Sequence, residues 1–157
     1  MTALFPADRI QLDVLATRSY RALGGLSGSV GLDPGLRHLV NVRASMVNGC
    51  AFCIDMHWKD ARAAGETEER LYSLAAWAES PLYDERERAA LLLCDAVTLV
   101  AEGHVADPVW ASAEAAFEPE ELAHLVFAII VINAWNRLSI TARTVPGSYE
   151  PTLRSAA

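Results

Sequence analysis

Two cysteines and a histidine lie within eight residues, in the segment Cys50-Ala-Phe-Cys53-Ile-Asp-Met-His57. Residues three and four positions apart share one face of an α-helix, so the two thiols and the imidazole would form one stripe. A thiolate beside a second thiol can reduce a peroxide or exchange with a disulfide, and a histidine can move the proton that either reaction requires. The spacing therefore indicates redox chemistry.

Cys50 follows Gly49, which we expect to end one helix, so this thiol stands at or near the start of the next. A helix N-terminus and a nearby imidazolium can lower a thiol pKa from about 8.5 to roughly 6, which raises the thiolate fraction about 30-fold. Thiolate nucleophilicity falls by roughly 13-fold over the same change, at a Brønsted slope of about 0.45. The net gain is only about twofold. Substrate positioning and proton transfer by His57 must therefore supply most of the acceleration.

The residues alone leave more than one interpretation of the cysteine pair. In a peroxidase cycle one thiolate becomes a sulfenic acid and the other cysteine condenses with it, whereas thiol-disulfide exchange uses the same pair without a peroxide. Cys-x-x-Cys is also half of a zinc ligand set, but no second paired motif follows, and we expect no metal site. The residues that could complete such a set are Cys94, His38, His104 and His124. Cys94 lies in an apolar run and is interpreted as a small buried hydrophobe.

Composition restricts the class of protein. The 157 residues fit one domain, 1–157, and 52 % of them are apolar, with a mean hydropathy of +0.18 that predicts a homo-oligomer. The net charge of −7, with Lys59 as the only lysine, argues against nucleic-acid binding. The N-terminus lacks the features of a secretory signal, and the longest apolar run, 125–132, is shorter than the ~20 residues that cross a bilayer. We expect a cytoplasmic protein without membrane contacts.

Strand patterns are nearly absent, while helix start and stop signals recur along the chain. Asp8 can cap a first helix that the pair Gly24-Gly25 ends or kinks. Prolines 34, 108 and 119 each follow an acidic residue, as at the first turn of a helix. We predict an all-α fold of about six to seven helices and a tail, 145–157, that lies over the surface or is disordered. The expected helices are 8–23, 34–48, 50–65, 67–80, 84–102, one from 107 onward, and about 120–142.

The segment Arg43-Ala-Ser-Met-Val-Asn-Gly-Cys50-Ala-Phe-Cys53-Ile-Asp-Met-His57 closely resembles the core of the alkylhydroperoxidase D-like (AhpD-like) branch of the carboxymuconolactone decarboxylase family. The similarity continues in three further segments and extends over about residues 20–147. These segments are Asp60-Ala-Arg-Ala-Ala-Gly-Glu-Thr67, Glu85-Arg-Glu-Arg-Ala-Ala-Leu91 and Ile132-Asn-Ala-Trp-Asn-Arg-Leu138.

The resemblance implies a single AhpD-like domain that assembles as dimers, trimers or hexamers and reduces hydroperoxides. By analogy with the family, Cys53 is the thiol that attacks the peroxide, Cys50 is its resolving partner, and His57 belongs to the proton relay. No cofactor is implied. The electrons of related enzymes come from a lipoylated or thioredoxin-like dithiol protein. Family members that decarboxylate lactones lack the cysteine pair, so that activity is not expected here.

The sequence departs from the family pattern at one position of the proton relay. The family commonly has a glutamate twelve residues before the first cysteine, and this chain has His38 there. Histidine accepts a proton near neutral pH, so His38 is a candidate catalytic residue, and Glu85 or Glu87 could instead replace the missing carboxylate. The same departure keeps open a non-enzymatic protein of this fold, acting as a redox sensor or a ligand-binding assembly protein.

Two further groups of residues have predicted roles outside this chemistry. Asn133 and Asn136 are interpreted as structural links between helices or subunits, because a buried amide needs a hydrogen-bond partner. Among the tryptophans, Trp58 is near enough to the cysteines to shape a pocket.

Overall fold

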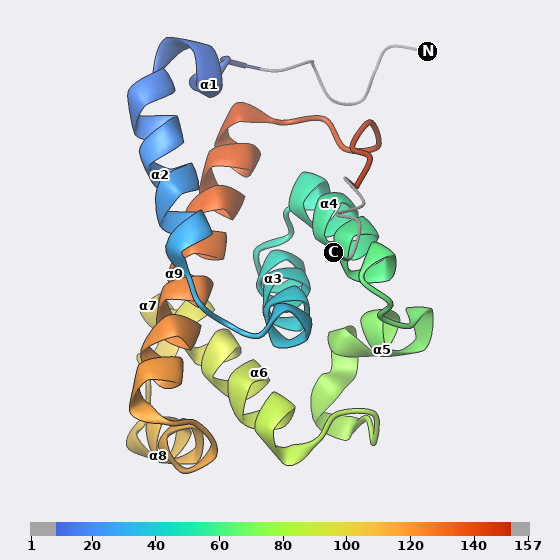
Figure 1. Cartoon of the computed structure of the whole chain (residues 1–157), viewed down its shortest axis with the longest axis vertical. Coiled ribbons are helices and arrows are strands. Elements are labelled where there is room, and N and C mark those ends of the chain that lie inside the picture. The colour runs from blue at the N-terminus through green and yellow to red at the C-terminus, as the bar shows by residue number, and fades with distance from the viewer. Residues whose placement is uncertain (1–8, 152–157) are drawn as a thin grey trace.

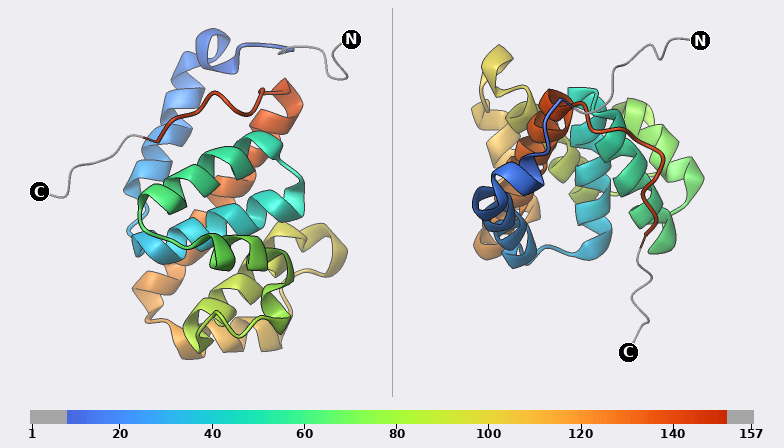
Figure 2. Two further views of the ribbon diagram at one scale, coloured as in Figure 1. Left: turned by 90° about the vertical axis from the view of Figure 1, so that its right-hand side faces the viewer. Right: turned by 90° about the horizontal axis from the view of Figure 1, so that it is seen from above.

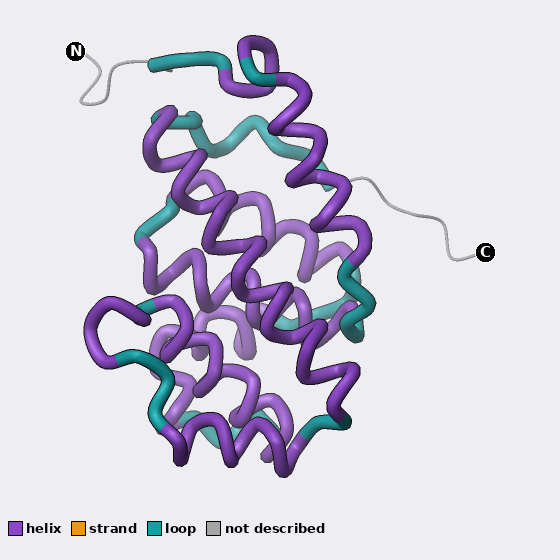
Figure 3. Tube along the Cα trace, turned by 90° about the vertical axis from the view of Figure 1, so that its left-hand side faces the viewer, coloured by secondary structure: helices purple, strands orange, loops and turns teal. Residues whose placement is uncertain are grey.

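The computed structural model describes residues 9–151. Within this part of the chain the protein is helical and has no strand (Figure 3), which confirms the predicted all-α class. The elements are α1 (Leu12–Leu15), α2 (Thr17–Ser29), α3 (Pro34–Asn48), α4 (Ala51–Ala63), α5 (Glu68–Ser73), the 3-10 helix η1 (Leu74–Glu79), α6 (Glu85–Thr98), α7 (Val100–Gly103), α8 (Asp107–Ala116) and α9 (Pro119–Ala142).

Helix α3 is the central element and packs against α4, α6 and α9 (Figure 1). Two hydrophobic clusters meet on it. Val40 belongs to the cluster around Ile129, which joins α3 to α6, α8 and α9. Leu39 belongs to the cluster around Leu71, which joins α3 to α4, α5, η1 and α6. Because α3 takes part in both clusters, it fixes the position of α4, the helix that begins at the cysteines.

The ends of α3 and the start of α4 follow directly from the sequence. Asp33 caps α3, because its Oδ1 accepts a hydrogen bond from the Leu36 amide at 2.9 Å, and Pro34 occupies the first turn. Gly49 ends α3 at φ +66°, a left-handed conformation that glycine adopts without steric cost. The chain then turns at Cys50, and α4 begins at Ala51. The predicted helix 34–48 and the predicted helix start at the cysteines are both confirmed.

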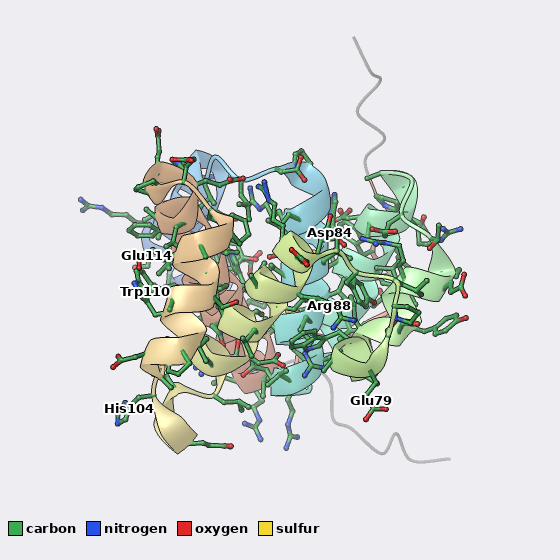
Figure 4. All side chains as sticks on the ribbon, turned by 90° about the horizontal axis from the view of Figure 1, so that it is seen from below. Glu79, Asp84, Arg88, His104, Trp110 and Glu114 are labelled. Carbon is green, nitrogen blue, oxygen red and sulfur yellow. The ribbon has the colours of Figure 1, made fainter. Side chains whose placement is uncertain are left out.

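Helix α6 also begins at a strong local signal, next to Asp84, which Figure 4 labels in a view from below. The Asp84 carboxylate accepts the Glu87 amide hydrogen at 2.8 Å, and the Glu87 carboxylate accepts the Asp84 amide hydrogen at 3.0 Å. One turn later, Arg88 donates to the backbone carbonyls of Tyr83 and Ser80. These bonds tie the start of α6 to the end of η1.

The described residues contain nine α-helices rather than the predicted six to seven. Two of the predicted helices are each split in two. Ala16 (φ −125°, ψ 40°) separates α1 from α2, and the Thr17 hydroxyl there donates to the carbonyls of Asp13 and Val14. This side chain competes for the acceptors of the helix backbone. Leu99 (φ −98°, ψ 28°) separates α6 from α7 in the same way, without a comparable side-chain bond.

The prediction that Gly24-Gly25 ends or kinks the first helix is wrong. Helix α2 runs through both glycines to Ser29 and has no buried residue, so no packing contact enforces a break there. Its C-terminal end is fixed from outside, because Arg37 of α3 donates to the backbone carbonyls of Ser27 at 2.7 Å and Val30 at 3.5 Å. The predicted cap, Asp8, lies outside the described residues.

Helix α9 lies alongside α2 and α3 (Figure 1) and begins at Pro119, as the sequence predicts. Its buried amides pair with α3. Asn48 donates to Asn133 Oδ1 at 3.0 Å and to Asn136 Oδ1 at 2.9 Å, and Asn136 in turn donates to the Ser45 hydroxyl at 3.0 Å. Asn133 also donates to the Thr98 hydroxyl of α6. These contacts agree with the structural role predicted for the two asparagines.

By length and composition α9 is the one described helix that could cross a membrane. It carries buried residues along its length, among them Leu125, Ile129 and Ile132, and these contribute to the main hydrophobic cluster. A central helix of a helical bundle has this composition as well. The position of α9 against α3, α6 and α8 is that of a core helix.

After α9 the chain crosses to α4 and runs along its outer surface (Figures 1 and 2). The Gly147 amide donates to Asp55 Oδ2 at 3.0 Å, Lys59 donates to the Tyr149 carbonyl at 2.9 Å, and the Tyr149 hydroxyl donates to Asp60 Oδ1 at 2.6 Å. We call residues 145–151 the C-terminal strap. These residues of the tail, which was predicted to lie over the surface or to be disordered, lie over the surface of α4, and residues 152–157 are outside the described part.

Candidate functional site

The two cysteines meet where α4 begins. Cys50 is the N-cap residue, and its sulfur accepts a hydrogen bond from the Cys53 amide at 3.4 Å. Each cysteine is only 1 % exposed. Since the cap turn places residue 53 one turn above residue 50, the two thiols lie next to each other at a helix N-terminus, as the spacing predicts.

The two thiols differ in their charge state. The pKa of Cys53 is lowered to about 7, mainly because the Cys50 thiol donates a hydrogen bond to its sulfur, and burial opposes this change. The Ser139 hydroxyl and the Asn136 amide, both from α9, lower it further. The pKa of Cys50 is raised for two reasons. Its thiol donates a hydrogen bond to Cys53, which favours the protonated form, and burial disfavours its thiolate. Cys53 is therefore the thiolate of the pair and Cys50 its hydrogen-bond donor.

His57 lies one turn beyond Cys53 on the same face of α4, and its side chain is 13 % exposed. Its pKa is lowered to about 4, first by burial and then by the neighbouring His38 and Arg37. The imidazole is neutral at pH 7. The predicted contribution of an imidazolium to the thiolate is therefore wrong, because packing against α3 excludes water from this ring. A neutral imidazole can still accept a proton from a thiol.

The buried neutral imidazole also makes stability depend on pH. An unfolded histidine protonates near pH 6.5 and the folded His57 near 4, so the unfolded chain binds more protons between these values. The contribution of His57 to stability is full above pH 6.5 and is lost as the pH falls toward 4. The difference between a pKa of 6.5 in the unfolded chain and about 4 in the folded protein corresponds to about 3 kcal/mol of folding free energy.

His38, the residue at the position of the family glutamate, reaches the same region from α3. Burial lowers its pKa, while the carboxylate of Asp60 raises it and the Arg37 guanidinium lowers it. His38 Nδ1 and His57 Nε2 are buried, and neither has a hydrogen-bond partner among the described residues. The structure thus brings His38 and His57 together. Both line one cavity of about 580 Å³, together with Leu32, Pro34, Arg37, Asn41, Asp60, Ala63, Ala64 and Pro151.

A second cavity, of about 340 Å³, lies on the cysteine side of His57. Cys53 and His57 line it, and most of its remaining wall is apolar or aromatic. Tyr20 of α2 and Trp135 of α9 both line it and contact each other edge to face, with ring centroids 4.9 Å apart. The other lining residues are Gly24, Ser27, Arg37, Asn41, Phe52, Met56, Ala128, Val131, Ile132 and Ser139. A cavity of this size and lining suits a small organic molecule.

Sequence reasoning missed part of this site. Ser139 was not predicted, although it lies three residues after Asn136 and six after Asn133, so that a polar stripe on an apolar helix was present in the sequence. The pocket tryptophan is Trp135 and not Trp58, whose Nε1 donates to Glu68 at 3.0 Å.

The alternative carboxylates lie elsewhere, as do Cys94, His104 and His124, three of the four residues that could complete a metal ligand set. Glu87 pairs with Arg70 and caps α6, and Glu85 is on the same first turn, so neither lines the cavities around His57. Cys94 is fully buried with a pKa raised to about 12 by burial. His104 lies at the end of α7 (Figure 4) and His124 Nδ1 accepts the Gly31 amide hydrogen. No group of three His, Cys, Asp or Glu residues in the described part of the chain could hold a metal ion.

These features define a helical dithiol protein, with a Cys-x-x-Cys pair at a helix N-terminus and a histidine one turn later. The model of the carboxymuconolactone decarboxylase family matches residues 15–96, and the chain belongs to this family. The resemblance to its AhpD-like branch is confirmed by the structures that share the fold.

The chain is 46 % identical over 104 residues to YdfG, an uncharacterised protein of Bacillus subtilis. The match covers 66 % of this chain and 71 % of YdfG. A crystal structure of an Agrobacterium tumefaciens protein of unknown function, proposed to be an antioxidant defence protein AhpD, has a TM-score of 0.86 at 37 % identity. The match covers 90 % of this chain and 99 % of that protein. The debrominase Bmp8 has a TM-score of 0.76 at 17 % identity, with 86 % of this chain and 74 % of Bmp8 covered, which indicates a shared fold.

Proposed function

We propose that the protein is a thiol-dependent peroxidase that reduces organic hydroperoxides or hydrogen peroxide through Cys53 and Cys50. The observation that carries this proposal is the position of Cys53. Its sulfur has a lowered pKa, lines the apolar cavity, and lies beside a protonated second thiol. A substrate bound in this cavity would meet the Cys53 thiolate, and the protonated Cys50 thiol stands next to that thiolate for the second step.

The proposed reaction balances as a two-electron reduction. The Cys53 thiolate attacks the terminal oxygen of ROOH, the O–O bond breaks, and the products are Cys53 sulfenic acid and RO⁻, which takes up a proton to give ROH. The Cys50 thiol then condenses with the sulfenic acid, so that a disulfide forms and water leaves. An external dithiol reduces this disulfide by exchange and is itself oxidised. We propose a lipoylated or thioredoxin-like protein as this reductant.

His57 and His38 are proposed to move the protons. Neutral His57 lines the same cavity as Cys53, where it can accept the thiol proton and return it to the leaving alkoxide. His38 lines the neighbouring cavity and replaces the family glutamate as the next proton carrier.

Burial of the cysteines favours a peroxide over a large disulfide as the oxidant. Cys50 and Cys53 are each 1 % exposed, so a protein disulfide would reach Cys53 only after helices move apart, as the protein dithiol that closes the cycle must also do. A hydroperoxide fits the 340 Å³ cavity as it stands. General thiol-disulfide exchange and a non-enzymatic redox sensor use the same thiols, and the assay below separates them from a peroxidase.

The proposal includes a cytoplasmic homo-oligomer, a dimer, trimer or hexamer. Large apolar side chains are exposed on two adjacent helices, Phe127 and Ile130 on α9 and Leu26 on α2. Such groups on a single chain are typical of subunit contacts. Light scattering of the purified protein tests this part, and a monomer at micromolar concentration would contradict it.

The test of the function is consumption of cumene hydroperoxide and of hydrogen peroxide with a dithiol as reductant. We expect turnover by the native protein, none by Cys53→Ser, and unchanged turnover by the control Cys94→Ser, because Cys94 is buried away from the cavity. Equal turnover by Cys53→Ser would refute the proposal. A disulfide that forms with peroxide in a single event, without turnover under any dithiol, would identify a sensor instead.

A further inference from the structure

Asp60 lies one turn after His57 on α4, close to both histidines of the site. Its Oδ2 is 3.9 Å from His57 Nδ1, and its Oδ1 accepts the hydrogen bond from the Tyr149 hydroxyl at 2.6 Å. Asp60 also lines the cavity that contains His38 and His57. The chain thus has a carboxylate in the site where the family glutamate is missing, but this carboxylate comes from α4 instead of α3.

The charged groups around the two histidines are few. Arg37 and Asp33 reach this region from α3, Asp60 from α4, and Glu66 from the segment that follows α4. Among them Asp60 has the largest effect on His38, whose pKa it raises. Asp60 is also the carboxylate for which a contact to His57 is observed. Asp60 therefore acts on His38 and lies beside His57.

We propose that Asp60 is the positioning residue of the proton relay: its carboxylate keeps the proton of His57 on Nδ1, and Tyr149 of the C-terminal strap holds the carboxylate in place. The inference rests on the proposed peroxidase function only for its effect on turnover. Asp60 itself touches neither the thiols nor the apolar cavity.

The chemical consequence concerns the other ring nitrogen. A neutral imidazole has one N–H and one lone pair, and the group that faces one nitrogen determines which tautomer is present. With the proton on Nδ1, toward Asp60, the lone pair is on Nε2. His57 Nε2 is buried without a partner among the described residues, and His57 lines the Cys53 cavity. Nε2 is then the atom that accepts the thiol proton.

The distance of 3.9 Å is longer than an N–H···O hydrogen bond, which spans about 2.7–3.2 Å. A small side-chain rotation on the same helix turn closes this gap, and hydrogen bonds of catalytic groups often tighten only when substrate is bound. Tyr149 limits the rotation, because it fixes the other carboxylate oxygen. The strap thereby links the end of α9 to the histidine on α4.

The structure offers a matched control for this proposal. Asp55 and Asp60 both lie on α4, and both accept a hydrogen bond from the strap, Asp55 from the Gly147 amide and Asp60 from Tyr149. Only Asp60 faces His57. Asp55→Asn therefore alters one contact of the strap but leaves the Tyr149–Asp60 bond and the charge beside the imidazole unchanged, whereas Asp60→Asn changes that charge.

The experiment measures the His57 tautomer by ¹⁵N NMR of the imidazole nitrogens in the full-chain protein, and the rate of peroxide-driven disulfide formation in one turnover. We expect the Nδ1–H tautomer in the native protein. In Asp60→Asn the amide oxygen accepts from Tyr149, so its NH₂ group turns toward Nδ1 and favours the Nε2–H tautomer. The rate of disulfide formation should fall roughly 10- to 100-fold. This loss is part of the rate enhancement of about 10²- to 10⁴-fold that general acid–base catalysis typically contributes.

Tyr149→Phe should shift the tautomer and the rate in the same direction by a smaller factor, and Asp55→Asn should match the native protein in both. The inference is overturned if Asp60→Asn keeps the native tautomer, or if Asp55→Asn loses as much rate as Asp60→Asn. If peroxide oxidises none of the proteins while the tautomer still follows Asp60, the proposed function fails and the positioning role stands. Tyr149→Phe preserves the test if Asp60→Asn does not fold.

Discussion

The hydrogen bond from Cys50 to Cys53 leads to a quantitative prediction for Cys50→Ala. This bond is the largest cause of the lowered pKa of Cys53, about 7 against an ordinary 9.0, so its removal should return the pKa toward 9. At pH 7 the thiolate fraction of Cys53 would then fall from about one half to about 1 %, or roughly 50-fold. The more basic thiolate is about 8-fold more nucleophilic at a Brønsted slope of about 0.45. The net effect is a roughly sixfold slower reaction at pH 7.

The same reasoning predicts that the order of the two proteins reverses at higher pH. At a pH where Cys53 is ionised in both the native protein and Cys50→Ala, the variant should react faster. The two rate profiles should cross near pH 8. The assay is the second-order rate of Cys53 alkylation by iodoacetamide between pH 5 and 10, with the modified peptide identified by mass spectrometry. Cys94→Ala is the background for all proteins, since it removes a buried thiol outside the site.

Cys50→Ser is the matched control, because a hydroxyl group still donates a hydrogen bond to Cys53. Its profile should lie between those of the native protein and Cys50→Ala. Identical profiles for the native protein and Cys50→Ala would refute the reasoning, because the low pKa of Cys53 would then come from α9 or from the helix N-terminus. A variant that is slower at every pH would mean that Cys50 positions Cys53 rather than ionising it.

Three further predictions concern the surroundings of the cysteines. His57→Gln should abolish the loss of about 3 kcal/mol of stability between pH 6.5 and 4, measured by urea unfolding at both pH values, and an undiminished acid loss would assign it to another group. Arg43→Met should lower the free energy of unfolding by about 2 to 3 kcal/mol, because Asp95 and the Leu74 carbonyl lose a half-buried partner, whereas a change below about 0.5 kcal/mol would be that of an exposed ion pair. His38→Ala should lower the rate of peroxide-driven disulfide formation, and His38→Glu should preserve or raise that rate. If both variants react at the native rate, His38 is not part of the proposed relay.

Local signals in the sequence were sufficient for the helices that hold the site. Asp33-Pro34 and Gly49 set the limits of α3, and the break at Gly49 places Cys50 at a helix N-terminus. Such capping is decided by neighbouring residues, and the sequence contains all of it. The pairing of Cys50 with Cys53 follows for the same reason, because both thiols belong to one turn.

The features that the sequence did not reveal depend on contacts between distant residues. His57 is neutral because α3 buries it, and no local pattern reports that burial. Ser139 became part of the site only when α9 was placed against α4, and the bond from Tyr149 that holds Asp60 depends on the strap. A contact between distant residues also decides where α2 ends. The helix continues through Gly24-Gly25 and ends where Arg37 donates hydrogen bonds to the carbonyls of Ser27 and Val30.

The buried asparagines of α9 fix the alignment of this helix against α3. A slide of α9 by one residue moves it about 1.5 Å along its axis and turns it by about 100°. That would carry Asn133 and Asn136 away from Asn48 and Ser45, and each stranded amide would cost about 1–3 kcal/mol. A helix with only apolar side chains could pack in many alignments of nearly equal free energy. The hydrogen bonds of Asn133 and Asn136 favour one alignment of α9. In that alignment Asn136 and Ser139 stand opposite Cys53, so the groups that fix the helix also tune the nucleophile.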